Sequence, residues 1–351
     1  MAEIVVYNEL YAPERDGKRW GPARYGAYVF TAEGPIEWLD LGPVATLHTV
    51  IRRFRLTISS APNRGGAKAA AKEIRRAVID PICNLLPATK EWYISPDGLL
   101  RLIPLAALPE EAGSSQPVTA GLQLHTITTA RDLMRGAPVH SVQPAWIAGI
   151  ADFGGDPASD SLLFPPIPGA KEEVEAVAKI IRPKAQLLAL EQMTKTFLLE
   201  KMNAPRVLHL ATHGYYHDDS GGGLALKDAN VSTQNILTQN DVAKLRLLGS
   251  QLVVLSACES GMGEVSFADG IIGLQRSLTL AGSRSQILTL WPVDDAKTKE
   301  LMVAFYGNLF DKGMTKSEAL RQAQLAMARD GLDMYFWAAF VLYGDSGPLG
   351  E

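Results

Sequence analysis

Residues 252–263 read LVVLSACESGMG, and residues 207–215 read VLHLATHGY. Each stretch opens with a run of Val and Leu, the pattern of a strand buried on both faces of a sheet. Each run stops at a reactive side chain with glycine close behind it, Cys258 in the first and His213 in the second. Parallel strands end at one edge of a sheet, where open α/β sheets place their sites. We therefore expect Cys258 and His213 to meet there as a nucleophile and its base.

The chain around these two stretches alternates strand and helix patterns. Residues 146–150 and 286–291 are short apolar runs, whereas residues 171–181 and 316–329 carry apolar side chains at helical spacing. This alternation predicts an α/β fold with a mostly parallel sheet and helices on both of its faces. A helix over residues 267–281 is expected to begin at a cap formed by Ser266 and Asp269.

A smaller unit precedes this sheet. We expect an N-terminal α/β subdomain over residues 1–130 and the main domain over residues 131–351. The first part predicts a hairpin of residues 25–31 and 36–41, because Glu33-Gly34-Pro35 between them is a turn signal. Residues 44–58 predict a helix, since apolar side chains recur there on one face.

Composition restricts the function classes. Of the 351 residues, 47% are hydrophobic and 21% are charged, which predicts a substantial core. The net charge of −4 lacks the basic excess of a nucleic-acid-binding protein. Cys83 and Cys258 are the two cysteines, and their different contexts predict free thiols in a reducing compartment. Since there is no signal peptide or bilayer-length apolar run, we expect a soluble, cytoplasmic protein with no direct nucleic-acid or membrane partner.

The residues beside the expected dyad favour acyl transfer. The backbone N–H groups of Gly214 and Cys258 would form an oxyanion hole for a tetrahedral intermediate. His213 would take the thiol proton and later return it to the leaving amine. A packing role for the thiol and a structural role for the histidine are the alternatives for these two positions.

Three histidines at His209, His213 and His217 have the spacing of zinc ligands on a helix. The segment reads as a strand, however, and Gly214 would interrupt a helix, so a zinc site is disfavoured. His209 is then expected to be structural, and no metal or cofactor is predicted. Gly221-Gly222-Gly223 follows no expected strand and has no P-loop lysine, which favours a flexible loop at the rim of the cleft.

Several segments resemble one known family, the CHAT domain, a branch of the caspase-like cysteine peptidases related to separase. The segments that carry the resemblance are PDGLLRLIPLAAL (96–108), IPGAKEEVEAV (167–177), HLATHG (209–214), VVLSACESG (253–261), ADGIIGLQRSLTLAG (268–282), LTLWPVDD (288–295) and WAAFVLYGD (337–345).

This resemblance implies a caspase-like α/β sandwich preceded by a smaller α/β region, with His213 and Cys258 as the catalytic dyad. Two aspartates are candidates for an acidic S1 pocket: Asp152, which follows the first strand of the main domain, and Asp295, which ends a stretch similar to the S1 segment of separase. Alternatively, Asp152 begins a loop, and Asp294 or Asp295 caps the next helix.

The resemblance also implies a regulated effector in bacterial stress or antiviral signalling. It would cleave a protein substrate and respond to a regulatory or sensor protein. The alternative is a non-catalytic CHAT-fold module for protein interaction. The natural substrate, the cleavage site and the trigger do not follow from these residues.

Overall fold

The computed structural model forms two compact units, Met1–Met134 and Arg135–Glu351. Whether these are the separate domains expected with a boundary after residue 130 stays a prediction. At positions 12–15, 216–217, 233, 258–259 and 264–270 only the backbone is described. The structure describes residues 1–15, 17–60, 64–86, 89–109, 117–136, 139–155, 163–181, 185–217, 221–259 and 264–350.

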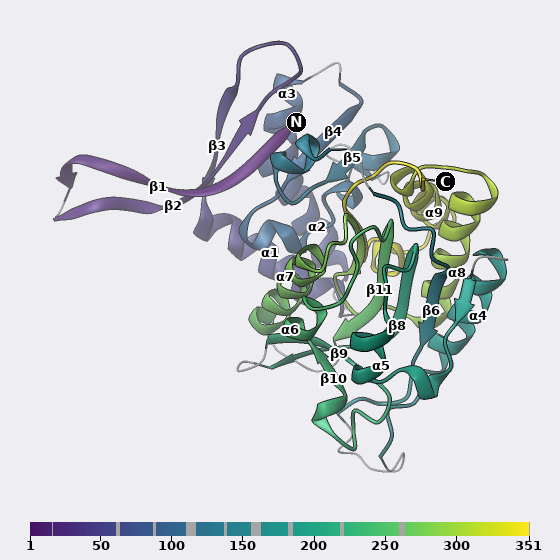
Figure 1. Ribbon diagram of the computed structural model, residues 1–351. Helices are drawn as coiled ribbons and strands as arrows, with labels where there is room; N and C mark the ends of the chain where they lie inside the picture. Colours follow the sequence, from purple (N-terminus) through teal and green to yellow (C-terminus); the bar gives the residue numbers. More distant parts are fainter. Residues whose placement is uncertain are drawn as a thin grey trace. The chain divides into compact units, whose positions relative to one another are not determined.

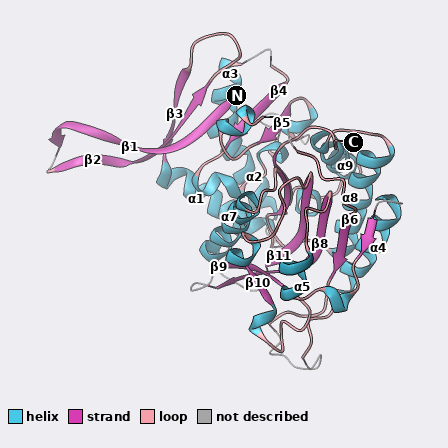
Figure 2. Cartoon of the chain, in the orientation of Figure 1, coloured by secondary structure: helices cyan, strands magenta, loops and turns pink. Residues whose placement is uncertain are grey.

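The first unit combines a five-stranded sheet with helices. Its strand order is β5-β4-β1-β2-β3, with antiparallel pairing from β1 to β3 and parallel pairing from β1 to β5 (Figures 1 and 2). The strands are β1 (Ala2–Arg15), β2 (Lys18–Val29), β3 (Glu37–Pro43), β4 (Glu91–Ser95) and β5 (Gln123–Thr126), and the α-helices are α1 (Val44–Ile58), α2 (Arg64–Ile74) and α3 (Asp80–Leu85).

One face of this sheet forms the core of the first unit. Ile4 of β1 and Tyr25 and Ala27 of β2 are buried, since alternate strand residues point to the same face. Helix α1 contributes a buried stripe that includes Ile51 and Phe54, and it packs against β2 and α2. The expected helix and hairpin are present, but the strand β1 was not predicted.

The second unit is built on a larger, mostly parallel sheet. Its strands are β6 (Ala145–Gly149), β7 (Ala185–Leu187), β8 (Val207–His217), β9 (Gly221–Ala225), β10 (Ile236–Thr238), β11 (Leu252–Glu259), β12 (Ser285–Thr289) and β13 (Phe340–Gly344). Its α-helices are α4 (Pro168–Ile181), α5 (Lys195–Lys201), α6 (Gln239–Val242), α7 (Glu264–Leu280), α8 (Asp295–Tyr306), α9 (Lys316–Arg329) and α10 (Met334–Trp337).

The strand order of this sheet is β7-β6-β8-β11-β12-β13. Strands β6, β8 and β11 are labelled in Figure 1. All neighbours are parallel except β13, which runs antiparallel to β12. The carboxyl end of β8 continues past β6 and pairs there with β9, which is antiparallel to it and in turn pairs with β10. The expected fold class is confirmed: the chain is α/β, with a mostly parallel sheet flanked by helices and a smaller α/β region before it.

Helices cover the two faces of this sheet. His209 of β8 contacts Glu173 of α4 and Tyr306 of α8, so α4 and α8 pack on the face that bears His209. The side chain of Gln286 in β12 is hydrogen-bonded to Thr279 of α7, and its register partner Val253 lies on the opposite face from His209. Helix α7 therefore covers the second face.

Two local expectations are wrong. Gly221, Gly222 and Gly223 do not form a loop but open β9, pairing with residues 215–217 at the end of a longer β8. Glycine suits this strand because a Cβ on Gly223 would lie 2.9 Å from the carbonyl oxygen of Leu237. Helix α7 begins at Glu264, so Ser266 lies inside its first turn and not at its cap.

No helix in the described part of the chain is long and apolar enough to span a bilayer. Helices α5 and α9 each begin at a threonine cap. Thr194 accepts from the Phe197 N–H at the start of α5, and Thr315 accepts from the Glu318 N–H at the start of α9.

Candidate active site

Strands β8 and β11 bring the two predicted residues together. Their parallel register runs without interruption from Leu252 opposite Val207 to Glu259 opposite Gly214. Within it Cys258 is the direct partner of His213. Neighbouring strands lie about 4.8 Å apart, and register partners belong to the same face of a sheet. The side chain of Cys258 and the loop 260–263 lie outside the described residues.

The His213 ring is buried and held from one side. Its exposed fraction is 7%, and its ring centroid lies 4.8 Å from that of Phe153 and 5.9 Å from that of Phe164. Its Nε2 lies 2.7 Å from the carbonyl oxygen of Pro165, which can only accept, so Nε2 carries a hydrogen. In the neutral ring the lone pair is therefore on Nδ1. This is the tautomer of a ring that accepts a proton at Nδ1.

The N–H of Gly214 is directed toward β11. The carbonyl oxygen of Ala211 accepts from the N–H of Ile150, which follows β6, at 2.9 Å. Successive residues of a strand direct their peptide groups to opposite neighbours, so Gly214, three residues later, faces the other side. Its register partner there is Glu259, the residue after Cys258.

A cavity of about 130 Å³ opens beside His213 on the face covered by α4 and α8. Its walls combine apolar groups with a few polar ones, which is typical of small-molecule and side-chain pockets. The lining residues come from β8, β11, α8 with the segment before it, and α4 with the segment before it: Ile167, Ala170, Glu173, Ala211, Thr212, His213, Ser256, Pro292, Val293, Asp295 and Thr298.

The two S1 candidates occupy different places. Asp295 lines this cavity, and the preceding Asp294 is the helix cap, accepting from the Lys297 N–H at 3.0 Å. Asp152 is exposed and is not among the residues that line the cavity, and its Oδ1 accepts from the N–H of Gly154. The structure thus places Asp295 near His213 and gives Asp152 the geometry of a turn.

A buried polar cluster lies on the same face, deeper along the strands. His209 is fully buried, its Nδ1 lies 3.0 Å from the Tyr306 hydroxyl, and its Nε2 lies 3.0 Å from Glu173 Oε1. The contact with Glu173 is close but does not have hydrogen-bond geometry. Ser256 donates to Glu173 Oε2 at 3.3 Å. Burial, together with the nearby Glu173, raises the pKa of Tyr306, which keeps its hydroxyl protonated.

Sequence reasoning found the strand-end residues but missed Glu173 and Pro165. Glu173 lies three residues after Ala170 and four before Val177, so the buried stripe of α4 passes through it. A carboxylate inside a helix stripe was the available signal. Pro165 contacts His213 through its backbone carbonyl. Every residue type has this group, so the sequence carries no signal for the contact.

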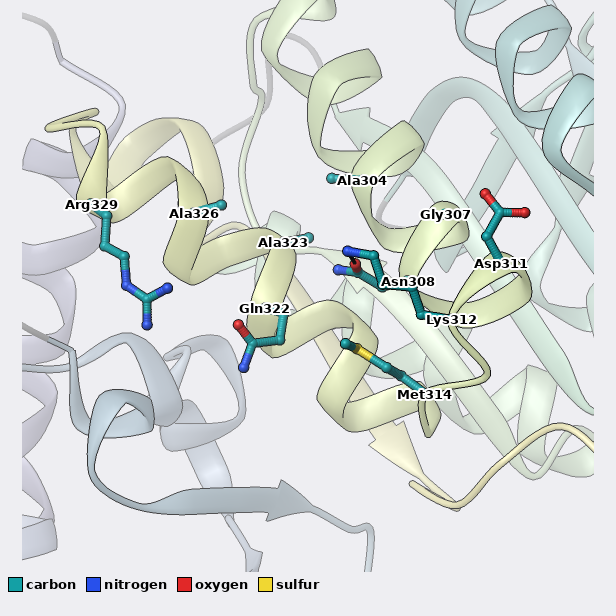
Figure 3. Close-up of a pocket in the computed structure, with 10 residues that line it drawn as sticks. All are labelled: Ala304, Gly307, Asn308, Asp311, Lys312, Met314, Gln322, Ala323, Ala326 and Arg329. Atoms are coloured by element: carbon teal, nitrogen blue, oxygen red, sulfur yellow. Dashed lines mark hydrogen bonds between the residues drawn. The ribbon is translucent and has the colours of Figure 1, made fainter.

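A second cavity of about 380 Å³ lies away from His213, where the π-helical segment Gly307–Asp311 meets α9 (Figure 3). Figure 3 shows Asn308 and Lys312 pointing toward each other. Lys312 donates to the Asn308 side chain, which in turn donates to the Ala319 carbonyl. These polar groups stabilise the helix ends. Across the described ranges no three His, Cys, Asp or Glu residues gather as metal ligands.

Comparison with known families decides the affiliation. The family model described as the CHAT domain matches residues 68–345, most of the chain. The chain belongs to the CHAT family. The resemblance seen in the seven sequence segments is thereby confirmed.

The curated relatives of this CHAT chain are much longer proteins. Tetratricopeptide repeat protein 28 of Homo sapiens is 26% identical over 302 residues, which cover 72% of this chain and 12% of that protein. The Mus musculus protein of the same name is 27% identical over 226 residues, covering 54% and 9%. The chain therefore matches only a small part of each relative.

Two solved structures of cysteine-peptidase systems are similar at low identity. The Arg-specific cysteine proteinase gingipain R matches with a TM-score of 0.48 and 10% identity, covering 86% of this chain and 74% of that one. The Saccharomyces cerevisiae separase–securin complex matches with a TM-score of 0.45 and 16% identity, covering 72% and 15%. The CHAT assignment rests on the family match and not on these two likenesses.

Proposed function

We propose that this CHAT chain is a cysteine endopeptidase that cleaves a protein substrate with Cys258 as nucleophile and His213 as base. The observation that carries the proposal is the register of β8 and β11, which pairs these two residues at the ends of neighbouring parallel strands. The tether from His213 Nε2 to the Pro165 carbonyl supports it, because it places the accepting lone pair on Nδ1.

The proposed reaction is acyl transfer in two steps. The Cys258 thiolate attacks the scissile carbonyl, and the N–H groups of Cys258 and Gly214 stabilise the oxyanion. His213 takes the thiol proton and gives it to the leaving amine. Water then attacks the thioester, and His213 returns the proton to the thiol.

For substrate binding, Asp295 is the S1 candidate that the geometry supports, because it lines the same cavity as His213. Asp152 is kept as the weaker candidate, since its carboxylate already accepts from its own turn.

The chain is proposed to act as an effector controlled by a protein partner. The matched relatives are tetratricopeptide repeat proteins, and the chain covers only 12% of the human one. Such repeats stack into extended binding surfaces, so a sensor of this kind is a reasonable partner for a catalytic unit. A role in bacterial stress or antiviral signalling in the cytoplasm rests on the family resemblance. Full-rate cleavage by the purified chain alone would contradict partner control.

Thiol reactivity tests the dyad without a known substrate. Burial raises the pKa of Cys83, so this thiol should react slowly with iodoacetamide. A Cys83→Ser chain removes that slow labelling and leaves Cys258 as the sole thiol. We expect rapid iodoacetamide labelling of Cys258 near neutral pH and clearly slower labelling after His213→Ala. Slow labelling that does not depend on His213 would favour the non-catalytic interaction module.

Cleavage itself is tested with a peptide library and mass spectrometry of the fragments. Cys258→Ala is expected to abolish cleavage, because no other nucleophile is proposed for the acyl transfer. Cys83→Ser is the matched control and should leave cleavage unchanged. A Cys258→Ala chain that still cuts the same peptides would overturn the mechanism.

A further inference from the structure

The cavity beside His213 has a buried carboxylate that neither the dyad nor the helix caps use. Glu173 is 3% exposed and lines the cavity, whereas a glutamate on the solvent face of α4 would stay hydrated. Buried carboxylates are rare because desolvation is costly, and they are retained where something compensates the charge. Its contacts with His209 and Ser256 engage one oxygen each.

A second polar group on the cavity wall lacks a partner. Thr298 of α8 is 4% exposed, and its Oγ1 has no hydrogen-bond partner among the described residues. It lines the same cavity as Glu173. Buried hydroxyls are normally hydrogen-bonded, so an unsatisfied one that lines a cavity indicates a site that a polar ligand group completes.

Apart from Asp295, the remaining walls are apolar or uncharged. Ile167, Ala170 and Val293 line the cavity, and no Lys or Arg is among the described residues that line it. Asp295 adds a second carboxylate, but it is exposed and lies in the first turn of α8, where it is favoured by the helix dipole. The cavity therefore has an aliphatic neck and an anionic, hydrogen-bonding floor.

The depth of the cavity matches a long side chain. Ser256, which contacts Glu173, lies two residues before Cys258 on β11, and two residues of a strand span about 6.6 Å. A carbonyl held at the level of Cys258 would thus place its flexible side chain alongside the apolar wall with its tip near Glu173.

We propose that Glu173, assisted by the Thr298 hydroxyl, is the specificity-determining residue of this cavity and selects a Lys or Arg side chain at the P1 position. The proposal rests on the proposed peptidase function and goes beyond it by naming the substrate class. Aliphatic methylenes would pack against Ile167 and Ala170, and the cationic head would pair with Glu173. Asp295 would contribute a weaker attraction at the mouth because it is exposed.

Ligand binding tests the cavity independently of catalysis. The probe is butylguanidine, titrated calorimetrically into the Cys258→Ala chain, with butanol as the neutral control. We expect butylguanidine to bind and butanol not to bind. Glu173→Gln should weaken butylguanidine binding about tenfold or more, as expected for a lost hydrogen bond to a charged group. Thr298→Val, which keeps the side-chain shape, should weaken it less.

Matched substitutions separate this cavity from general surface charge. Glu172→Gln removes an exposed carboxylate outside the cavity and should leave binding unchanged. An Asp152→Asn chain that loses binding, while Glu173→Gln retains it, would overturn the assignment in favour of the other S1 candidate.

A substrate panel that varies only P1 completes the test. The unmodified chain should cleave Arg and Lys substrates with a kcat/KM about tenfold or more above that for Met and Leu, and Glu173→Gln should remove the preference while keeping Met cleavage. Cleavage that favours Met or Leu in the unmodified chain would overturn the inference but leave the peptidase. No cleavage of any peptide, with butylguanidine still bound, would instead overturn the proposed function. If Glu173→Gln fails to fold, the preference of the unmodified chain decides.

Discussion

Two histidines of β8 share one face of the sheet, four residues apart, and have opposite surroundings. His209 lies in the middle of the strand, is fully buried and contacts Glu173 and Tyr306 from two helices. His213 lies toward the carboxyl end, beside a cavity, and its contacts include a backbone carbonyl and two phenylalanine rings. The position along the strand, and not the residue type, therefore distinguishes the structural histidine, His209, from the candidate base, His213.

This contrast teaches how the fold divides its polar groups. In the interior, α4 and α8 enclose the strand face, so each polar side chain needs partners from those helices. Near the strand end the helices give way to the cavity, and a polar group there is available to a ligand. The two histidines should therefore respond to mutation in opposite ways, the inner one in stability and the outer one in activity.

The largest expected effect is on activity at the outer histidine. His213→Asn removes the proposed base, so kcat/KM for any cleaved peptide should fall by about a hundredfold to ten-thousandfold. Its unfolding free energy should fall by only about 1 kcal/mol, because one hydrogen bond is lost. Peptide kinetics and urea unfolding of the same preparation measure both. A His213→Asn chain that is strongly destabilised but keeps its kcat/KM when folded would contradict this expectation.

The next effect is on stability at the inner histidine. His209→Leu removes the buried contact that Glu173 and Tyr306 share, so the unfolding free energy should fall by about 2–4 kcal/mol. Tyr306→Phe removes one hydroxyl and keeps the ring, so it should cost only about 1 kcal/mol. Urea denaturation provides the values. Equal losses for the two variants would show that His209 contributes packing alone.

The smallest effect is expected at an ion pair in which only one partner is buried. Lys316 has a side chain that is 2% exposed, but its partner Asp345 is 40% exposed. Removing Lys316 leaves the carboxylate solvated and still accepting from the Gly347 N–H. Lys316→Met should therefore change the unfolding free energy by about 1 kcal/mol or less, in either direction.

The pH dependence of this pair has a defined sign. Burial lowers the pKa of Lys316 below its ordinary value, so between the two values the unfolded chain binds more protons than the folded chain. Its contribution to stability consequently rises with pH up to about 10.4, the ordinary lysine pKa. Urea midpoints at neutral and alkaline pH should show this rise in the unmodified chain, and Lys316→Met should flatten it. An unchanged slope would assign the pH dependence to other groups.

Much of the fold could be predicted because the apolar periodicity is strong. The helices at Val44–Ile58 and Lys316–Arg329 occur with the predicted limits. Val and Leu runs that end at Cys258 and His213 predicted strands that the structure pairs in register. These features depend on local sequence alone.

Other features depend on contacts between distant segments. Strand β1 interrupts its apolar residues with Glu3, Asn8 and Glu9, and its full length depends on pairing with β2, so periodicity alone did not reveal it. Gly221–Gly223 form a strand because residues 215–217 of β8 offer an edge for pairing. The cavity needs α4, α8 and two strands at once, and a Cβ on Gly149 would lie 2.5 Å from the Ala170 carbonyl oxygen, too close for α4 to hold its place. No window of sequence contains that geometry.

The hydrogen bond from His213 to position 165 ends on a main-chain oxygen. Every amino acid supplies that oxygen, so alanine scanning would pass over position 165 without noticing its part in aligning the imidazole. The alignment follows the path of the chain through residues 163–167 and is inherited by any sequence that keeps this path. To disturb it, the main chain itself has to shift, as it would through a lengthened or shortened loop ahead of α4.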